Sequence, residues 1–164
     1  MKVFIIAAVT ADGFIARSSS HLADWTSKED KQFFTQKTKQ AGVVVMGLNT
    51  YKTIARPLPG RQNIVYAPPG TALEGVEITQ DEPKTLLSKL EQKGLKEVAI
   101  CGGATIYTMF MEADVVDTLY LTIEPIVFGN GIRLFNRELD VKLQLQSMQK
   151  LNEQAVLLEY NVIK

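Results

Sequence analysis

Short apolar segments alternate with segments of helical periodicity along most of this chain. The segments 3–9 and 43–46 are continuously apolar and rich in β-branched residues, as expected of strands covered on both faces. Shorter strands are predicted at 63–66, 76–78, 98–101 and 119–123, and helices at 27–40, 49–54, 82–93 and 104–111. This order implies an α/β fold with a mostly parallel central sheet, helices on both faces, and an antiparallel C-terminal edge that ends with strands at about 155–162.

Local signals delimit the first helix. Thr26 and Glu29 have the spacing of a capping box, which predicts the helix start. Phe33 and Phe34 recur with Thr38 on one face, and Gly42 is a typical residue just past a helix end. These signals together predict the helix at about 27–40.

Size and charge limit the classes of partner. A length of 164 residues predicts one domain, 1–164, so a ligand site must lie within a single layered unit. Lys plus Arg and Asp plus Glu number 18 each, so no net charge attracts nucleic acid or an anionic membrane. The apolar segment 3–9 is too short to span a membrane. We therefore expect a small-molecule partner, with neither nucleic acid nor membrane binding.

Cysteine and histidine are rare in this chain. Cys101 has no partner for an internal disulfide, which is typical of a reducing compartment and predicts a cytoplasmic protein. His21 is the only histidine and lies in a polar loop, where a structural or solvent-facing role is expected. No metal site is expected from this composition.

Two glycine turns follow buried strands and open helices. One is Cys101-Gly102-Gly103-Ala104, and the other is Met46-Gly47-Leu48-Asn49-Thr50-Tyr51, in which Asn49 or Thr50 can cap the helix. Bare glycine backbone lets a phosphate reach the N–H groups of a helix N-terminus. Gly-Gly after a strand is also common in simple tight turns, and the six-residue dinucleotide fingerprint is absent. Together the two turns predict a site for two phosphates of one dinucleotide.

Two charged residues are candidates for substrate contact. The segment Arg-Pro-Leu-Pro-Gly-Arg at 56–61 is a proline-stiffened loop that ends in Arg61, whose guanidinium suits a carboxylate or phosphate. Trp25, the only tryptophan, precedes Asp30 by five residues near the start of the first helix. The alternatives are a solvated surface arginine and an acidic residue that merely complements the helix dipole.

In this order, these motifs resemble the dihydrofolate reductase family. The resemblance covers nearly the whole chain, and its most specific parts are Met-Gly-x-x-Thr-aromatic at 46–51 and Arg-Pro-Leu-Pro-Gly-Arg at 56–61. It implies a dihydrofolate reductase-like three-layer fold and an oxidoreductase of one-carbon metabolism. The implied reaction is NADPH-dependent reduction of 7,8-dihydrofolate to tetrahydrofolate, with NADH as the alternative cofactor, by a monomer or homodimer.

The resemblance also implies residue roles. Asp30 would be the active-site carboxylate, Trp25 and Thr122 would belong to the catalytic group with it, and Arg61 would bind the glutamate carboxylate of the folate. The implied substrate-binding residues are Ile6, Ala7, Asp30, Phe34, Ile54, Leu58, Arg61, Cys101, Tyr107 and Thr122. The implied cofactor-binding residues are Ala8, Ile15, Gly47, Leu48, Asn49, Thr50, Ala67, Cys101, Gly102, Gly103, Ala104, Thr105, Ile106 and Tyr107.

The chain departs from the family pattern at several positions. Leu48 stands where many members have an arginine for the 2′-phosphate of NADPH, so we expect weaker discrimination against NADH. Ala104 replaces a third glycine, and the segment 17–24 is longer than usual and lacks the Asn-x-Met-Pro pattern. The segment 123–135 is more similar to the reductase domains of riboflavin biosynthesis.

Two alternative functions follow. One is reduction of a ribosylaminopyrimidine phosphate in riboflavin biosynthesis, since Arg61 suits a phosphate as well as a carboxylate. The other is nucleotide binding without catalysis. The joint presence of Asp30 and Arg61 favours an enzyme, and the Trp25–Asp30 spacing favours the folate substrate.

Overall fold

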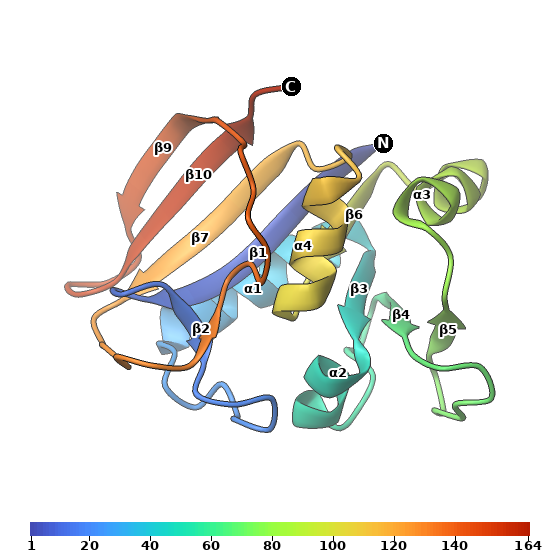
Figure 1. The fold of residues 1–164 in the computed structure, drawn as a ribbon, viewed down its shortest axis with the longest axis horizontal. Coiled ribbons are helices and arrows are strands. Elements are labelled where there is room, and N and C mark those ends of the chain that lie inside the picture. Colours follow the sequence, from blue (N-terminus) through green and yellow to red (C-terminus); the bar gives the residue numbers. More distant parts are fainter.

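An eight-stranded sheet forms the centre of the computed structural model, which describes residues 1–164 (Figure 1). The strand order is β5-β4-β3-β6-β1-β7-β10-β9. The strands are β1 (Lys2–Thr10), β3 (Val43–Gly47), β4 (Gln62–Tyr66), β5 (Glu77–Thr79), β6 (Glu97–Ile100), β7 (Thr118–Glu124), β9 (Leu143–Lys150) and β10 (Val156–Val162). The pairs from β5 through β7 are all parallel, and β10 is antiparallel to both β7 and β9. The predicted parallel sheet with an antiparallel C-terminal edge is confirmed.

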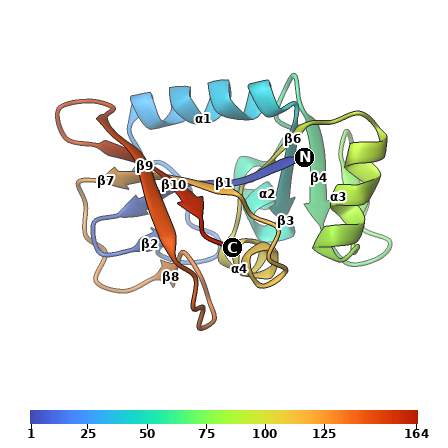
Figure 2. The same cartoon turned by 90° about the horizontal axis from the view of Figure 1, so that it is seen from above.

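Helices cover both faces of the sheet (Figure 2). Helix α1 (Lys28–Ala41) lies on one face, while α3 (Pro83–Gln92) and α4 (Ala104–Glu112) lie on the other. Helix α2 (Leu48–Ile54) follows β3 directly at the carboxyl end of that strand. The predicted three-layer arrangement is therefore confirmed. None of the four helices combines the length and the apolarity needed to cross a membrane.

Strand β1 contributes to two apolar clusters, one on each face of the sheet. Val3 and Ile5 pack with residues of α3 and α4, whereas Phe4 and Ile6 pack with residues that contact Phe33 of α1. Successive side chains of a strand point to opposite faces, so a strand buried on both faces must be apolar at every position. This explains the continuous apolar run at the start of the sequence.

The helix starts differ in detail from the sequence predictions. Ser27, not Thr26, is the N-cap of α1, and its Oγ accepts a hydrogen bond from the backbone N of Asp30 at 3.2 Å. The expected capping box at Thr26 is therefore wrong by one residue. Helix α2 is capped by Gly47 without a side-chain hydrogen bond, so capping by Asn49 or Thr50 is also wrong.

Three strands were not predicted. Strand β9 has the sequence LQLQSMQK, and all eight of its residues are exposed; it forms an edge of the sheet and pairs only with β10. Strands β2 (Phe14–Ala16) and β8 (Ile132–Arg133) form a separate two-stranded ribbon. Neither the edge strand nor the very short ribbon strands bury enough side chains to impose an apolar pattern.

Candidate active site

A large cavity lies where the parallel strands end. Its volume is about 780 Å³, within the usual range for small-molecule sites. Residues of β1, β3 and β4 contribute to its walls, together with the turn that follows β6, α1, α2, the first half of α4 and the loop before α1. Parallel strands place their carboxyl ends at one edge of the sheet, which is where ligands bind in such folds.

The two glycine turns pack against each other in this cavity. Strands β3 and β6 are neighbours, and the N–H of Gly47 donates to the carbonyl of Gly102 at 2.7 Å. Gly102 has φ +111°, and a Cβ there would lie 3.0 Å from the hydroxyl of Tyr107. A Cβ on Gly47 would lie 3.1 Å from Cγ1 of Ile106. A side chain would be strained at Gly102 by the positive φ and would press against Ile106 at Gly47, so both turns pack tightly against α4.

The N-terminus of α4 faces the same cavity. Its N-cap residue is Gly103, which has no side chain that could cap the helix. Residues 103–107 all line the cavity. The N–H groups of a first helical turn have no intrahelical partner, and the helix dipole adds partial positive charge there. This helix start is therefore suited to an anionic group.

Asp30 is the only acidic residue that lines the cavity. It is half-buried near the start of α1, with Ile6, Trp25 and Phe34 among the cavity residues around it. Burial is the largest influence on its carboxyl group and raises the pKa, and the negative charge of Glu124 raises it further. Hydrogen bonding from Thr122 and the charge of Lys31 oppose this rise, and the net pKa is higher than usual.

Two buried residues support the cavity behind Asp30. Tyr107 donates its hydroxyl proton to the carbonyl of Ile6 at 2.9 Å, and burial raises its pKa well above the usual value. Burial likewise raises the pKa of the Cys101 thiol to about 12. Both groups are therefore uncharged near neutral pH, so Asp30 carries the negative charge of the cavity.

Arg61 lies beside the cavity and does not line it. Its Nη1 donates to Oγ1 of Thr38 at 2.8 Å, and its Nε donates to the carbonyl of Pro59 at 3.0 Å. Thr38 lies one turn after Phe34 on α1, which places the guanidinium next to the end of the cavity formed by Phe34 and Leu58. Burial lowers the pKa of Arg61, but an arginine remains charged at neutral pH.

Asn63 holds the turn that carries Arg61. Its Oδ1 accepts from the N of Leu58 at 2.8 Å, and its Nδ2 donates to the carbonyls of Leu58 and Arg61 at 2.9 and 2.8 Å. The side chain is buried, so these three bonds are shielded from water. From the sequence, Asn63 was expected only as part of a strand; its polar side chain at the start of an apolar run was the signal for this further role.

Most of the predicted site residues do line the cavity. The exceptions are Arg61, Thr122 and Ala67. Thr122 is buried in β7 behind Asp30, and Ala67 is buried just after β4, where its carbonyl accepts a hydrogen bond from Gln80. The remaining residues predicted to bind substrate or cofactor are brought together in one cavity.

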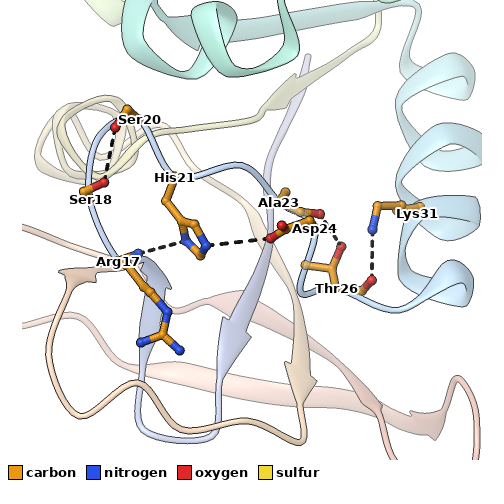
Figure 3. A network of polar contacts seen from close by, with 8 residues as sticks. All are labelled: Arg17, Ser18, Ser20, His21, Ala23, Asp24, Thr26 and Lys31. Carbon is orange, nitrogen blue, oxygen red and sulfur yellow. Dashed lines mark hydrogen bonds and ion pairs between the residues drawn. The ribbon is translucent and has the colours of Figure 1, made fainter.

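Residues of the loop 17–26 line one side of the cavity. Figure 3 shows the polar contacts of this loop. Nδ1 of His21 accepts from the backbone N of Arg17 at 3.1 Å, and its Nε2 lies 3.7 Å from the Asp24 carboxylate. Lys31 of α1 donates to the carbonyl of Thr26 at 2.9 Å, which ties the loop to the helix. His21 lines the cavity, a position that the sequence analysis did not predict.

Phe128 anchors this loop from the other side. Its ring contacts Trp25 edge-on at 5.2 Å and His21 at 5.7 Å between centroids, and the Arg17 guanidinium lies 4.0 Å from the centroid. The carboxylate of Asp12 accepts the backbone N–H of Phe128, at 3.2 Å. The segment 123–135 therefore positions Trp25 in the cavity wall.

Solved structures define the fold class. A dihydrofolate reductase from Enterococcus faecalis, complexed with NADP(H), superposes with a TM-score of 0.77 at 24% identity, covering 99% of this chain and 97% of that one. A candidate riboflavin biosynthesis protein from Shewanella sp. PV-4 superposes with a TM-score of 0.84 at 19% identity, covering 100% of both chains. The fold of this chain is therefore the one that these two proteins share.

Sequence comparison assigns the family. The family model for dihydrofolate reductase matches residues 2–131, so the chain belongs to the dihydrofolate reductase family of oxidoreductases. Dihydrofolate reductase type 3 of Salmonella typhimurium is 34% identical over 125 residues, or 74% of this chain and 71% of that one. The protein YwjB of Bacillus subtilis is 27% identical over 170 residues, or 97% of each chain. Both features of the predicted resemblance, to dihydrofolate reductases and to riboflavin-biosynthesis reductases, are confirmed.

Proposed function

We propose that this protein is an NADPH-dependent dihydrofolate reductase. The observation that carries the proposal is the single carboxylate of Asp30 in a cavity that also contains the uncapped start of α4. The Asp30 carboxylate suits the polar edge of a pterin, and the start of α4 suits the phosphates of a dinucleotide. Membership of the family and the 34% identical dihydrofolate reductase type 3 support the same function.

Asp30 is proposed to bind the pterin ring. A carboxylate can accept two hydrogen bonds, from N3–H and from the 2-amino group of the pterin. Ile6, Phe34 and Ile54 line the same cavity and provide apolar contacts for the ring and the aryl group. Arg61, fixed by Thr38 and Pro59, retains its Nη2 for a carboxylate at the end of the substrate.

The cavity residues fit a nicotinamide dinucleotide. The first turn of α4 offers free N–H groups, and the absence of a Cβ at Gly47 and Gly102 lets the two glycine turns pack closely against that helix. When bound, the cofactor supplies the hydride that reduces the C=N bond. Leu48 also lines the cavity and offers no charge to a 2′-phosphate, so NADH is the alternative cofactor.

The role of Asp30 in the reaction is electrostatic. Reduction of the C=N bond adds a proton to the ring nitrogen, and a nearby negative charge stabilises that protonated form. The carboxylate binds the opposite edge of the ring, so we infer that the proton reaches the nitrogen through water. Trp25 and the loop 17–26 limit the access of solvent to the cavity, which strengthens the interaction.

Reduction of a ribosylaminopyrimidine phosphate is the second candidate function. The superposition with the Shewanella protein over both full chains favours it, and Arg61 suits a phosphate as well as a carboxylate. The Asp30 carboxylate can also bind the N–H groups of a pyrimidine. The two substrates therefore share the cavity residues and differ in the group that would contact Arg61.

A parallel assay separates these functions. Purified protein is mixed with NADPH or NADH and with either dihydrofolate or the ribosylaminopyrimidine phosphate, and cofactor oxidation is followed by absorbance. We expect turnover with dihydrofolate and NADPH. Turnover of the pyrimidine alone would establish the second function. Binding of the cofactor without turnover of either substrate would contradict both.

A further inference from the structure

Glu124 is a buried acidic residue to which the proposed reaction assigns no role. It lies at the end of β7, and only 2% of its surface is exposed. Its Oε1 accepts two hydrogen bonds from Ser27, from the backbone N and from Oγ, both at 2.8 Å. A carboxylate buried this deeply is costly unless it is paired or hydrogen-bonded, and here both bonds come from the residue that caps α1.

The Ser27 hydroxyl connects Glu124 to Asp30. An ionised carboxylate can only accept hydrogen bonds, so the hydroxyl proton of Ser27 must point toward Glu124. The lone pairs of the same oxygen are then free to accept the backbone N–H of Asp30, at 3.2 Å. Glu124 therefore determines the orientation of the cap, and the cap determines where the first turn of α1 holds Asp30.

Glu124 also acts on Asp30 through its charge. The charged groups that influence the Asp30 carboxyl are Glu124 on β7 and Lys31 on α1, and the neutral Thr122 and Tyr107 face it from β7 and α4. The like charge of Glu124 raises the pKa of Asp30, in addition to the effect of burial. Lys31 is exposed, and its Nζ is hydrogen-bonded to Thr26, so it offsets this repulsion only in part.

We propose that Glu124 is a positioning residue for the pterin-binding carboxylate: it orients the Ser27 cap and places a second negative charge behind the site. This inference rests on the function proposed for Asp30. Two negative charges attract a protonated ring more strongly than one. The same repulsion makes Asp30 harder to ionise, so Glu124 links the charge state of the cavity to pH.

The test is a titration of the Asp30 carboxyl in the free protein, which requires no substrate. The 13C signal of Asp30 is assigned by its loss in Asp30→Asn. In Glu124→Gln the amide oxygen can still accept from Ser27, but the charge is gone. We expect the titration midpoint of the Asp30 carboxyl to lie at lower pH in Glu124→Gln than in the wild type. Glu29→Gln is the matched control, because Glu29 lies in the same helical turn and its carboxylate is bonded to Asn152, outside the cavity.

A second pair of variants tests the orientation of the cap. Glu124→Ala removes the acceptor, so its thermal midpoint should fall by about 2–4 °C relative to Glu124→Gln, the effect of losing one helix cap. Ser27→Ala removes both the hydroxyl donor to Glu124 and the side-chain cap that accepts from the N of Asp30, so the titration midpoint of Asp30 should move relative to Glu29→Gln. Ser27→Ala therefore tests the connection between Glu124 and Asp30 even if Glu124→Gln does not fold.

Two results would overturn the inference. One is an Asp30 midpoint that moves no further in Glu124→Gln, or in Ser27→Ala, than in Glu29→Gln. The other is equal thermal stability of Glu124→Ala and Glu124→Gln. If the midpoints move as expected but dihydrofolate is not reduced, the placement of Asp30 by Glu124 stands and the proposed substrate is wrong.

Discussion

Replacing Asp30 with asparagine tests the proposed catalytic role most directly. The change keeps the size and shape of the side chain and removes the only negative charge that lines the cavity. Asn and Asp have similar helix propensities, so α1 should form normally. The loss should therefore appear in turnover and not in folding.

The magnitude follows from the position of the charge. We place the carboxylate on one edge of the pterin and the protonated nitrogen across the ring, about 6 Å away, so at an effective dielectric constant of about 20 their attraction is about 2.8 kcal/mol. A loss of this size lowers the rate by about a hundredfold. Asp30 is half-buried, so an effective dielectric constant between protein and water is appropriate.

Dependence on pH separates catalysis from helix stabilisation. At low pH the substrate is already protonated and depends less on stabilisation by the Asp30 carboxylate. The kcat of Asp30→Asn should therefore approach that of the wild type as the pH falls. The assay is kcat for dihydrofolate at saturating NADPH across pH 5–9. Near-normal kcat of the variant at every pH would refute the role of Asp30 in the reaction.

Stability should change in the opposite direction to activity. The pKa of Asp30 is raised in the folded protein, chiefly by burial, so its ionised form opposes folding. This cost is absent below the pKa of the unfolded chain and develops as the pH rises through the folded pKa. Asp30→Asn should therefore be at least as stable as the wild type to heat at pH 7, and no more stable than it at pH 3. A variant that is less stable at pH 7 would indicate that Asp30 mainly supports the helix.

Three further outcomes are expected. Because Leu48 offers no charge to the 2′-phosphate, the preference for NADPH over NADH in kcat/KM should be about ten- to a hundredfold smaller than in an enzyme with a cationic side chain at this position. Leu48→Arg should restore the preference for NADPH. Arg61→Ala should raise KM for dihydrofolate and leave kcat nearly unchanged, because the guanidinium lies beside the cavity; equal KM for substrates with and without a glutamate tail would contradict this. Gly102→Ala should weaken NADPH binding measured by fluorescence, because φ is +111° and the new Cβ would lie 3.0 Å from the hydroxyl of Tyr107.

Some elements of the fold could be predicted from local sequence patterns, and others depend on tertiary contacts. The apolar runs at 3–9 and 43–46 identified central strands, because a strand buried on both faces admits no polar position. Strand β9 has no continuous apolar run; its leucines and glutamines alternate, which is typical of a strand with one polar face, and all of its residues are exposed. At the start of α1, Thr26 and Ser27 are both good caps; in the structure Ser27 donates to Glu124, whereas the Thr26 hydroxyl donates to the carbonyl of Ala23.

The sequence by itself determined the class of fold, the two glycine turns and the residues that gather around the cavity. The fold class and the glycine turns depend on periodicity and on backbone conformations that only some residues adopt, so a few neighbouring positions are enough to predict them. The cavity residues were predicted from the resemblance to the dihydrofolate reductase family. The tertiary structure decided which distant groups meet. It placed Glu124 against Ser27, 97 positions away, and Arg61 against Thr38, 23 positions away. Such contacts depend on strand order and helix packing, which local sequence does not encode.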